Sequence, residues 1–169
     1  FKVSFSSFIY RFLFNIGLKR YRIFDLKKYE LTIKESFNLL KEVSEKNILY
    51  MPLAFQPEVT SNPMTLPLFT IHSSISLIRS ILPENWILLV KDHPSMLTYS
   101  HLSYSNYRND ITGEIITNSD NCFLVNNKIK SSEILNVTNA VLTGVGSVGT
   151  EALLKGIPVI TYGNGPYIS

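Results

Sequence analysis

Short apolar runs alternate with segments of helical spacing along most of this 169-residue chain, and this alternation restricts its fold more than any other feature. We predict a buried strand in each apolar run, at residues 48–55, 86–91, 122–127, 140–144 and 157–163. Apolar residues at three- and four-residue steps predict helices at 25–47, 68–82, 131–136 and 147–156. Strands that alternate with helices form a parallel sheet covered on both faces. The sequence therefore predicts an α/β, Rossmann-like fold with helices on both faces.

The composition is that of a folded globular protein, with 45% apolar and 17% charged residues. The single cysteine, Cys122, lies in an apolar run and has no partner for an internal disulfide, so we predict a buried structural thiol rather than a nucleophile. The three histidines (His72, His93 and His101) lack metal-ligand spacing, and we predict no structural metal.

Residues 1–24 are basic and aromatic, with five basic residues, no acidic residue and eight of the 20 aromatic residues. The segment has no small-residue cleavage site and is too charged to span a bilayer. Two interpretations stay open. It is a linker packed against another part of a larger protein, or it lies on an anionic membrane surface. We expect residues 25–169 to form the folded domain.

Polar loops follow three of the predicted strands. They are "QPE" at 56–58, "KDHP" at 91–94 and "GVGSVGTE" at 144–151. Open parallel sheets bind their ligands at the carboxyl ends of the strands, so we expect the three loops to meet at one edge.

Gly144, Gly146 and Gly149 stand where the last predicted helix begins. Bare backbone at a helix N-terminus suits an anion, because unpaired N–H groups and the helix dipole point at it. Ser147 and Thr150 add hydroxyl donors. The spacing fits neither the Walker pattern nor the dinucleotide fingerprint, and a packing turn is the alternative to a phosphate site.

Two further side chains are candidates for the same ligand. Glu151, one turn into the helix, would accept hydrogen bonds from a ribose or would simply favour the helix dipole. His93, held out of helical conformation by Pro94 and close to Lys91, would bind a phosphate oxygen or occupy an ordinary turn. The remaining carboxylates show no pairing for acid–base work and are predicted to be solvated: Glu84, Asp92, Asp110 and Glu114.

The motifs "YMPLAFQPEVT", "LPENWILLVKDHP" and "VLTGVGSVGTEALLKGIPVITYG" occur in an order that resembles the capsule polysaccharide biosynthesis family, over residues 48–167. That family includes bacterial transferases of the Kdo type with the glycosyltransferase-B fold. The resemblance implies the C-terminal, donor-binding half of that fold, without its acceptor domain and truncated before its closing helices. Lys91-Asp92-His93-Pro94 departs mildly from the family's usual Lys-Glu-His-Pro.

The resemblance implies a glycosyltransferase that adds a sugar, such as Kdo from CMP-Kdo, to a glycan or glycolipid acceptor of a surface polysaccharide. It implies a cytoplasmic protein, peripheral on the inner membrane face if residues 1–24 bind lipid, with no partner nucleic acid and no cofactor besides the nucleotide sugar. The fragment alone is expected to be inactive. The resemblance implies His93 as the catalytic residue. For substrate binding it implies Gln56, Glu58, Lys91, Pro94, Gly144, Gly146, Ser147, Val148, Gly149, Thr150 and Glu151.

Three alternatives stay open. A sugar-nucleotide 2-epimerase would show a Ser-Gly-Gly loop, and a teichoic-acid-type glycerophosphotransferase an Asp-Tyr-Ser-Ser loop; "TGVGSVGTEA" contains neither. The third is a non-enzymatic domain that binds a nucleotide or a partner in polysaccharide assembly or export.

Overall fold

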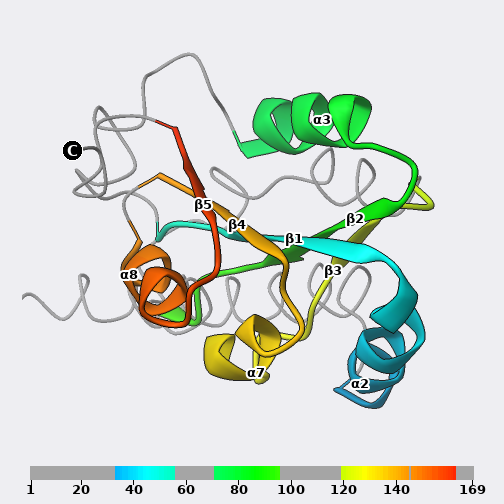
Figure 1. The fold of residues 1–169 in the computed structure, drawn as a ribbon, viewed down its shortest axis with the longest axis horizontal. Helices are drawn as coiled ribbons and strands as arrows, with labels where there is room; N and C mark the ends of the chain where they lie inside the picture. The colour runs from blue at the N-terminus through cyan, green and yellow to red at the C-terminus, as the bar shows by residue number, and fades with distance from the viewer. Residues whose placement is uncertain (1–32, 56–70, 96–118, 145, 163–169) are drawn as a thin grey trace, which may run out of the picture.

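Five parallel strands form one sheet in the computed structural model, within the part of the chain that the structure describes, residues 33–55, 71–95, 119–144 and 146–162 (Figure 1). The strands are β1 (Asn47–Pro52), β2 (Trp86–Lys91), β3 (Cys122–Leu124), β4 (Ala140–Thr143) and β5 (Val159–Thr161). The helices are α2 (Ile33–Glu42), the 3-10 helix η1 (Val43–Glu45), α3 (Ile71–Ile81), α7 (Ser131–Leu135) and α8 (Ser147–Leu154). The predicted Rossmann-like α/β fold is confirmed. The segment 1–24, predicted as a linker or interfacial element, lies outside the described residues.

The strand order is β3-β2-β1-β4-β5, with every neighbouring pair parallel. From β1 the chain builds the sheet in one direction through β2 and β3, and then returns to add β4 and β5 on the other side of β1. This reversal places a topological switch point between β1 and β4, where open α/β sheets leave a crevice at their carboxyl edge.

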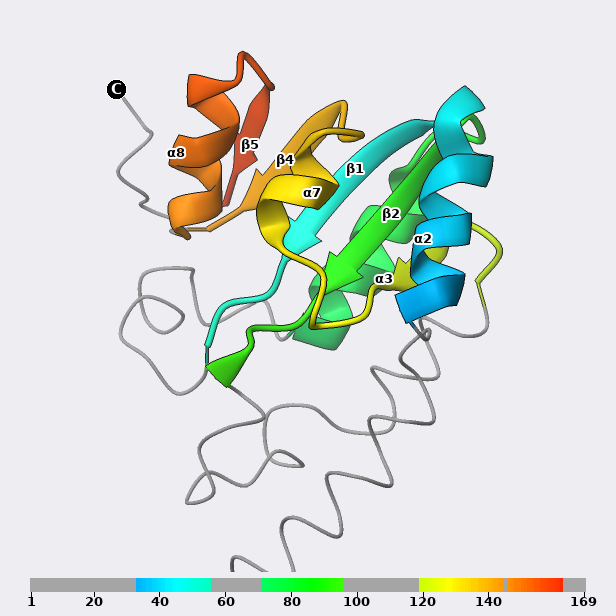
Figure 2. The ribbon, with the colours of Figure 1, turned by 90° about the horizontal axis from the view of Figure 1, so that it is seen from below.

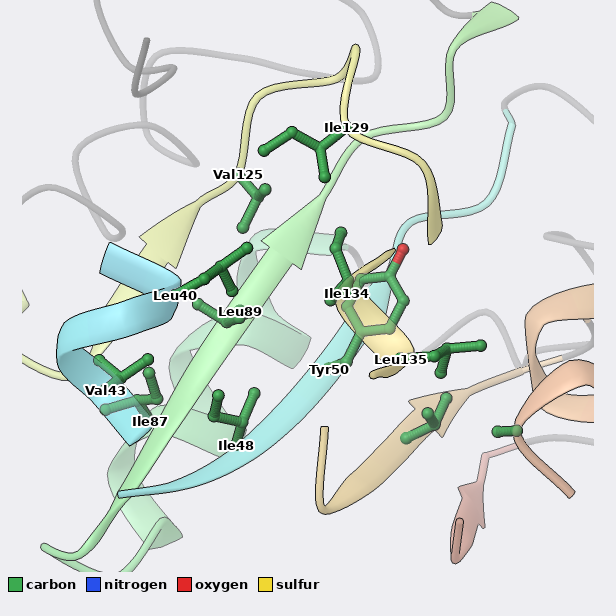
Figure 3. Close-up of a cluster of buried hydrophobic side chains, with 12 residues drawn as sticks. Leu40, Val43, Ile48, Tyr50, Ile87, Leu89, Val125, Ile129, Ile134 and Leu135 are labelled. Carbon is green, nitrogen blue, oxygen red and sulfur yellow. The ribbon is translucent and has the colours of Figure 1, made fainter. Parts of the chain in front are cut away.

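Side chains of successive strand residues enter two different cores, one on each face of the sheet. Ile48 and Tyr50 belong to the core covered by α2, α7 and α8, whereas Leu49 and Met51 belong to the core covered by α3 (Figures 1 and 3). The second strand alternates in the same way. Because both faces are covered, each central strand is apolar at nearly every position, which explains the continuous apolar runs of the sequence.

The buried thiol predicted for Cys122 agrees with the structure. Its side chain is 1% exposed in the core on the α3 face, and burial raises the pKa of the thiol to about 12.

Four predicted strands are shorter than the runs that predicted them. The first ends at Pro52, the third at Leu124, the fourth at Thr143 and the fifth at Thr161. After β3 the ladder continues by one bond, from the Val125 N–H to the Val90 carbonyl at 2.8 Å, and the chain then turns at Asn126. An apolar residue near a strand end can therefore belong to the core without belonging to the sheet.

The helix predicted at 25–47 also ends early. Helical structure stops at Glu45, because Lys46 adopts an extended conformation (φ −103°, ψ 149°) and Asn47 begins β1. The part before residue 33 lies outside the described residues.

The helix α8 ends in a Schellman motif at Gly156. Gly156 has φ +72°, and its N–H donates to the Leu153 carbonyl at 3.0 Å while the Ile157 N–H donates to the Ala152 carbonyl at 2.9 Å. A positive φ favours glycine, so this residue directs the chain from α8 into β5.

Asn139 fixes the start of the pairing between β1 and β4. Its Oδ1 accepts from the Ile48 N–H at 2.8 Å, and its own N–H donates to the Ile48 carbonyl at 3.0 Å. The side chain thus acts as an additional rung below the Leu49–Ala140 pair and sets the register of the two strands that flank the switch point. None of the described helices combines the length and apolar character needed to cross a bilayer.

Candidate functional site

A cavity of about 380 Å³ opens at the carboxyl edge of the sheet, where β1, β2 and β4 end. Pro52 pairs directly with Lys91, and Tyr50 pairs with Val141, so Thr143 ends β4 level with Pro52. Figure 2 shows β1 and β2 ending at the same edge, with residues 53–55 and 92–95 continuing beyond it. The register therefore brings together three loops that lie about 40 to 50 residues apart in sequence, at the switch point.

The structure places eight of the predicted site residues on the wall of this cavity: Lys91, His93, Pro94, Gly144, Gly146, Ser147, Val148 and Glu151. Gly149 and Thr150 lie on α8 but are not among the lining residues, since Gly149 packs inward and Thr150 is exposed elsewhere. Gln56 and Glu58 lie outside the described residues. The structure tests the position of these residues, and their roles in binding stay predictions.

The N-terminus of α8 points its backbone N–H groups toward the cavity. Gly146 is the N-cap residue, with φ −75° and ψ 147°, and no side chain caps the helix. The Gly149 N–H donates to the Gly146 carbonyl at 3.1 Å, and the N–H groups of Ser147 and Val148 precede it in the first turn. These two residues line the cavity, so their amides and the positive end of the helix dipole are available to an anion there.

Close packing, rather than backbone conformation, favours glycine at position 146. Its φ is one that any residue adopts, but a Cβ atom added here would stand 3.2 Å from the Oγ1 of Thr143. The Gly146 N–H also faces this hydroxyl oxygen, at 3.4 Å. The bare backbone thus keeps α8 close to the end of β4 and leaves the cavity wall without a side chain.

His93 is held by contacts on several sides. Its ring nitrogen Nδ1 accepts a hydrogen bond from the Ser95 backbone N–H at 3.2 Å. The backbone N–H of His93 donates to Asp92 Oδ1 at 2.8 Å. The ring also packs against Phe55, with 5.6 Å between centroids and an interplanar angle of 53°. Both rings line the cavity, so loops after β1 and β2 together fix the imidazole.

The prediction that Asp92 is solvated is wrong. Asp92 is 6% exposed, and the adjacent Lys91 is 5% exposed. Lys91 is the last residue of β2, and the Leu53 N–H donates to its carbonyl at 2.8 Å, which continues the ladder beyond Pro52. The strand ends of β1 and β2 therefore bury both charged residues, an effect of register that the isolated sequence "KDHP" does not reveal.

Sequence reasoning missed a pair of hydroxyl groups in the cavity. Tyr50 of β1 and Ser131, the first residue of α7, face each other with 3.1 Å between their oxygen atoms. Figure 3 shows the Tyr50 ring beside Ile134 and Leu135, with its hydroxyl at the edge of the apolar cluster. Burial raises the pKa of Tyr50 to about 12, against the lowering effect of the Ser131 hydrogen bond, and the Glu151 carboxylate adds to the increase. The phenol is therefore a neutral hydrogen-bonding group at physiological pH.

Charge in the cavity is mixed. The buried Lys91 and the α8 N-terminus are positive, whereas Asp92 and the exposed Glu151 are negative. A ligand that combines an anionic group with hydroxyl groups matches this distribution. Among the described residues, no group of three His, Cys, Asp or Glu side chains is arranged to hold a metal ion.

No protein-family model matches the chain, and no curated protein sequence matches it. Among solved structures, the chain is similar to the Thermosulfurimonas dismutans protein KpsC, described as a beta Kdo 2,7 transferase, with a TM-score of 0.54 and 18% sequence identity. The similarity covers 91% of this chain and 47% of that one, so the chain spans about half of the length of KpsC. At this identity the similarity supports the shared fold alone, and membership of the capsule polysaccharide family stays a prediction.

Proposed function

We propose that the cavity binds the nucleotide part of a nucleotide sugar and that the protein is a glycosyltransferase of surface-polysaccharide synthesis. One observation carries the proposal. His93 and the uncapped N-terminus of α8 line the same cavity at the switch point of a parallel sheet. The two groups reach it from different strand ends, as the binding of a phosphate from two sides requires.

In glycosyl transfer an acceptor hydroxyl attacks the anomeric carbon, and the bond from that carbon to the phosphate oxygen breaks. The electron pair of this bond remains on the phosphate, so negative charge grows there in the transition state. Under the proposal, His93 and the amides of Ser147 and Val148 stabilise this charge. Donors that are already fixed in place need little reorganisation as the charge develops.

Glu151 is proposed to bind the ribose. It lines the cavity one turn after Ser147 on α8, and its exposed carboxylate would accept hydrogen bonds from two vicinal hydroxyl groups. Gln56, Glu58 and Lys91 are proposed to complete donor binding at the same edge. No residue of this chain is assigned to the acceptor or to the general base.

The donor is proposed to be a CMP-linked sugar of the Kdo type, on the basis of the motif resemblance and of the name of the similar structure. The acceptor is proposed to be a glycan or glycolipid, used at the cytoplasmic face of the membrane.

Calorimetry with CMP and UDP tests nucleotide binding, and product analysis with a panel of nucleotide sugars and glycan acceptors tests transfer. We expect CMP to bind and to compete with the donor. Absence of binding for both nucleotides at millimolar concentration would contradict the proposal. Conversion of a nucleotide sugar without any acceptor would instead support an epimerase.

A further inference from the structure

The contacts around His93 bear on which of its ring nitrogens carries a proton. We infer that the Ser95 amide and Asp92 are positioning groups that hold His93 as a neutral imidazole with its proton on Nε2, so that it acts as a hydrogen-bond donor and not as a base. The inference about the tautomer depends only on the geometry. Its consequence for the ligand rests on the proposed function.

The tautomer follows from the Ser95 contact. A backbone N–H can only donate, so Nδ1 at 3.2 Å from the Ser95 nitrogen must offer its lone pair. In a neutral imidazole one nitrogen carries the proton and the other carries the lone pair, which places the proton on Nε2. Nε2 then has no lone pair with which to accept a proton from an acceptor hydroxyl. It can donate a hydrogen bond to a phosphate oxygen, and no covalent step at the ring is required.

The position of the ring follows from Asp92 and Phe55. The buried Asp92 carboxylate accepts from the His93 N–H at 2.8 Å, which restrains the backbone that carries the ring. Phe55, from the loop after β1, contacts the ring itself. Asp92, the Ser95 amide and Phe55 together therefore restrain the His93 ring and its Nε2–H group. Such restraint is expected where a donor must be in place before its ligand binds.

The tautomer can be measured on the wild-type protein without any ligand. Long-range ¹H–¹⁵N correlation spectra at about pH 8, where an ordinary imidazole is neutral, distinguish a protonated from an unprotonated ring nitrogen. His93→Gln assigns the signal by removing it. We expect a protonated Nε2 and an unprotonated Nδ1. Protonation on Nδ1, or an imidazolium at this pH, would overturn the inference whether or not a nucleotide binds.

The cause of the tautomer is tested by removal of the donor. Ser95→Pro lacks the N–H group, whereas Ser95→Ala keeps it and serves as the matched control. We expect a mixture of both tautomers in Ser95→Pro and the wild-type tautomer in Ser95→Ala. An unchanged tautomer in a folded Ser95→Pro protein would show that the amide does not determine it.

A pair of isosteric substitutions tests the same inference through CMP binding. The amide nitrogen of glutamine can reach the position of Nε2, whereas that of asparagine corresponds to Nδ1. We expect His93→Gln to bind CMP within about fivefold of wild type, and His93→Asn to lose at least about tenfold, the cost of one hydrogen bond to a charged group. The reverse order would overturn the inference.

Asp92 is tested by rescue. Asp92→Ala removes the acceptor for the His93 N–H, and Asp92→Asn keeps an acceptor oxygen. We expect CMP affinity to fall in the first and to recover in the second, whereas equal affinity in Asp92→Ala and wild type would remove Asp92 from the inference. If wild type binds no nucleotide at all, the proposed function fails, and the spectra still decide the tautomer.

Discussion

The hydroxyl oxygen of Tyr50 lies 3.1 Å from that of Ser131, and this contact joins the central strand β1 to the first residue of α7 across 81 positions of sequence. Both residues line the cavity, and Tyr50 is fully buried. The hydrogen bond therefore connects the apolar core to the polar wall of the site.

Deletion of either hydroxyl group, that of Tyr50 or that of Ser131, should lower the free energy of unfolding modestly. We expect Tyr50→Phe and Ser131→Ala each to reduce the free energy of unfolding by about 1 kcal/mol, because each leaves one hydroxyl without this partner. Urea denaturation of the two single variants and the double variant measures their coupling. Strictly additive losses would show that the 3.1 Å contact contributes nothing.

Alkaline pH should destabilise the protein through Tyr50 and Cys122. Burial raises both pKa values to about 12, from ordinary values of 10.0 for Tyr50 and 9.0 for Cys122. Between these limits the folded state binds more protons than the unfolded state, so this stability is complete below pH 9 and is lost as pH rises toward about 12. Urea midpoints at about pH 8 and pH 10.5 measure the loss, which should be smaller in the Tyr50→Phe/Cys122→Ala variant. Equal losses in both proteins would contradict this account.

In the full-length enzyme, His93→Ala should lower turnover much more than stability. Loss of one well-placed donor to a developing anion costs on the order of 3 kcal/mol of transition-state stabilisation, or roughly a hundredfold in kcat. We expect the free energy of unfolding to change by less than about 1 kcal/mol, since the ring is only half buried beside the cavity. Steady-state kinetics and urea denaturation measure the two effects. A proportional loss of both would indicate a structural histidine.

Glu151→Gln should weaken CMP binding by about tenfold, because hydrogen bonds from the ribose to a carboxylate are present in the ground state and the transition state alike. Glu84→Gln is the matched control. It makes the same change at an exposed position before β2, at the opposite end of that strand from the cavity. Calorimetry on both variants measures the difference. Wild-type affinity in Glu151→Gln would leave Glu151 as a residue that only favours the helix dipole.

Two glycine substitutions should have opposite effects. Gly146→Ala places a methyl group 3.2 Å from Thr143 Oγ1 on the cavity wall, and we expect weaker CMP binding with a small loss of stability. Gly156→Ala meets no atom within 4 Å but strains a residue at φ +72°, and we expect a loss of about 1 kcal/mol with unchanged binding. Calorimetry and urea denaturation separate the two. Similar profiles for both variants would contradict the assignment of Gly146 to the site.

The sequence was sufficient for the fold because burial on both faces leaves a direct trace, as the run at 86–91 shows by matching β2 residue for residue. The cavity lies where a general rule about strand ends predicts a site. The burial of Asp92 and the meeting of Tyr50 with Ser131 could not be predicted, since both depend on how strands align and on how α7 packs. The positive φ of Gly156 was not predicted either, since it depends on how α8 ends.

The pair of hydrogen bonds between Asn139 and Ile48 has a consequence for how the protein folds. It joins residues 91 positions apart, and the cavity needs β4 beside β1. During synthesis β1 therefore cannot pair with β4 until some 90 further residues have been added to the chain. Contacts of such sequence separation form slowly, because the intervening chain must be ordered before they yield any stabilisation. The cavity cannot be complete before β4 has joined β1, so we expect ligand binding to appear late in folding.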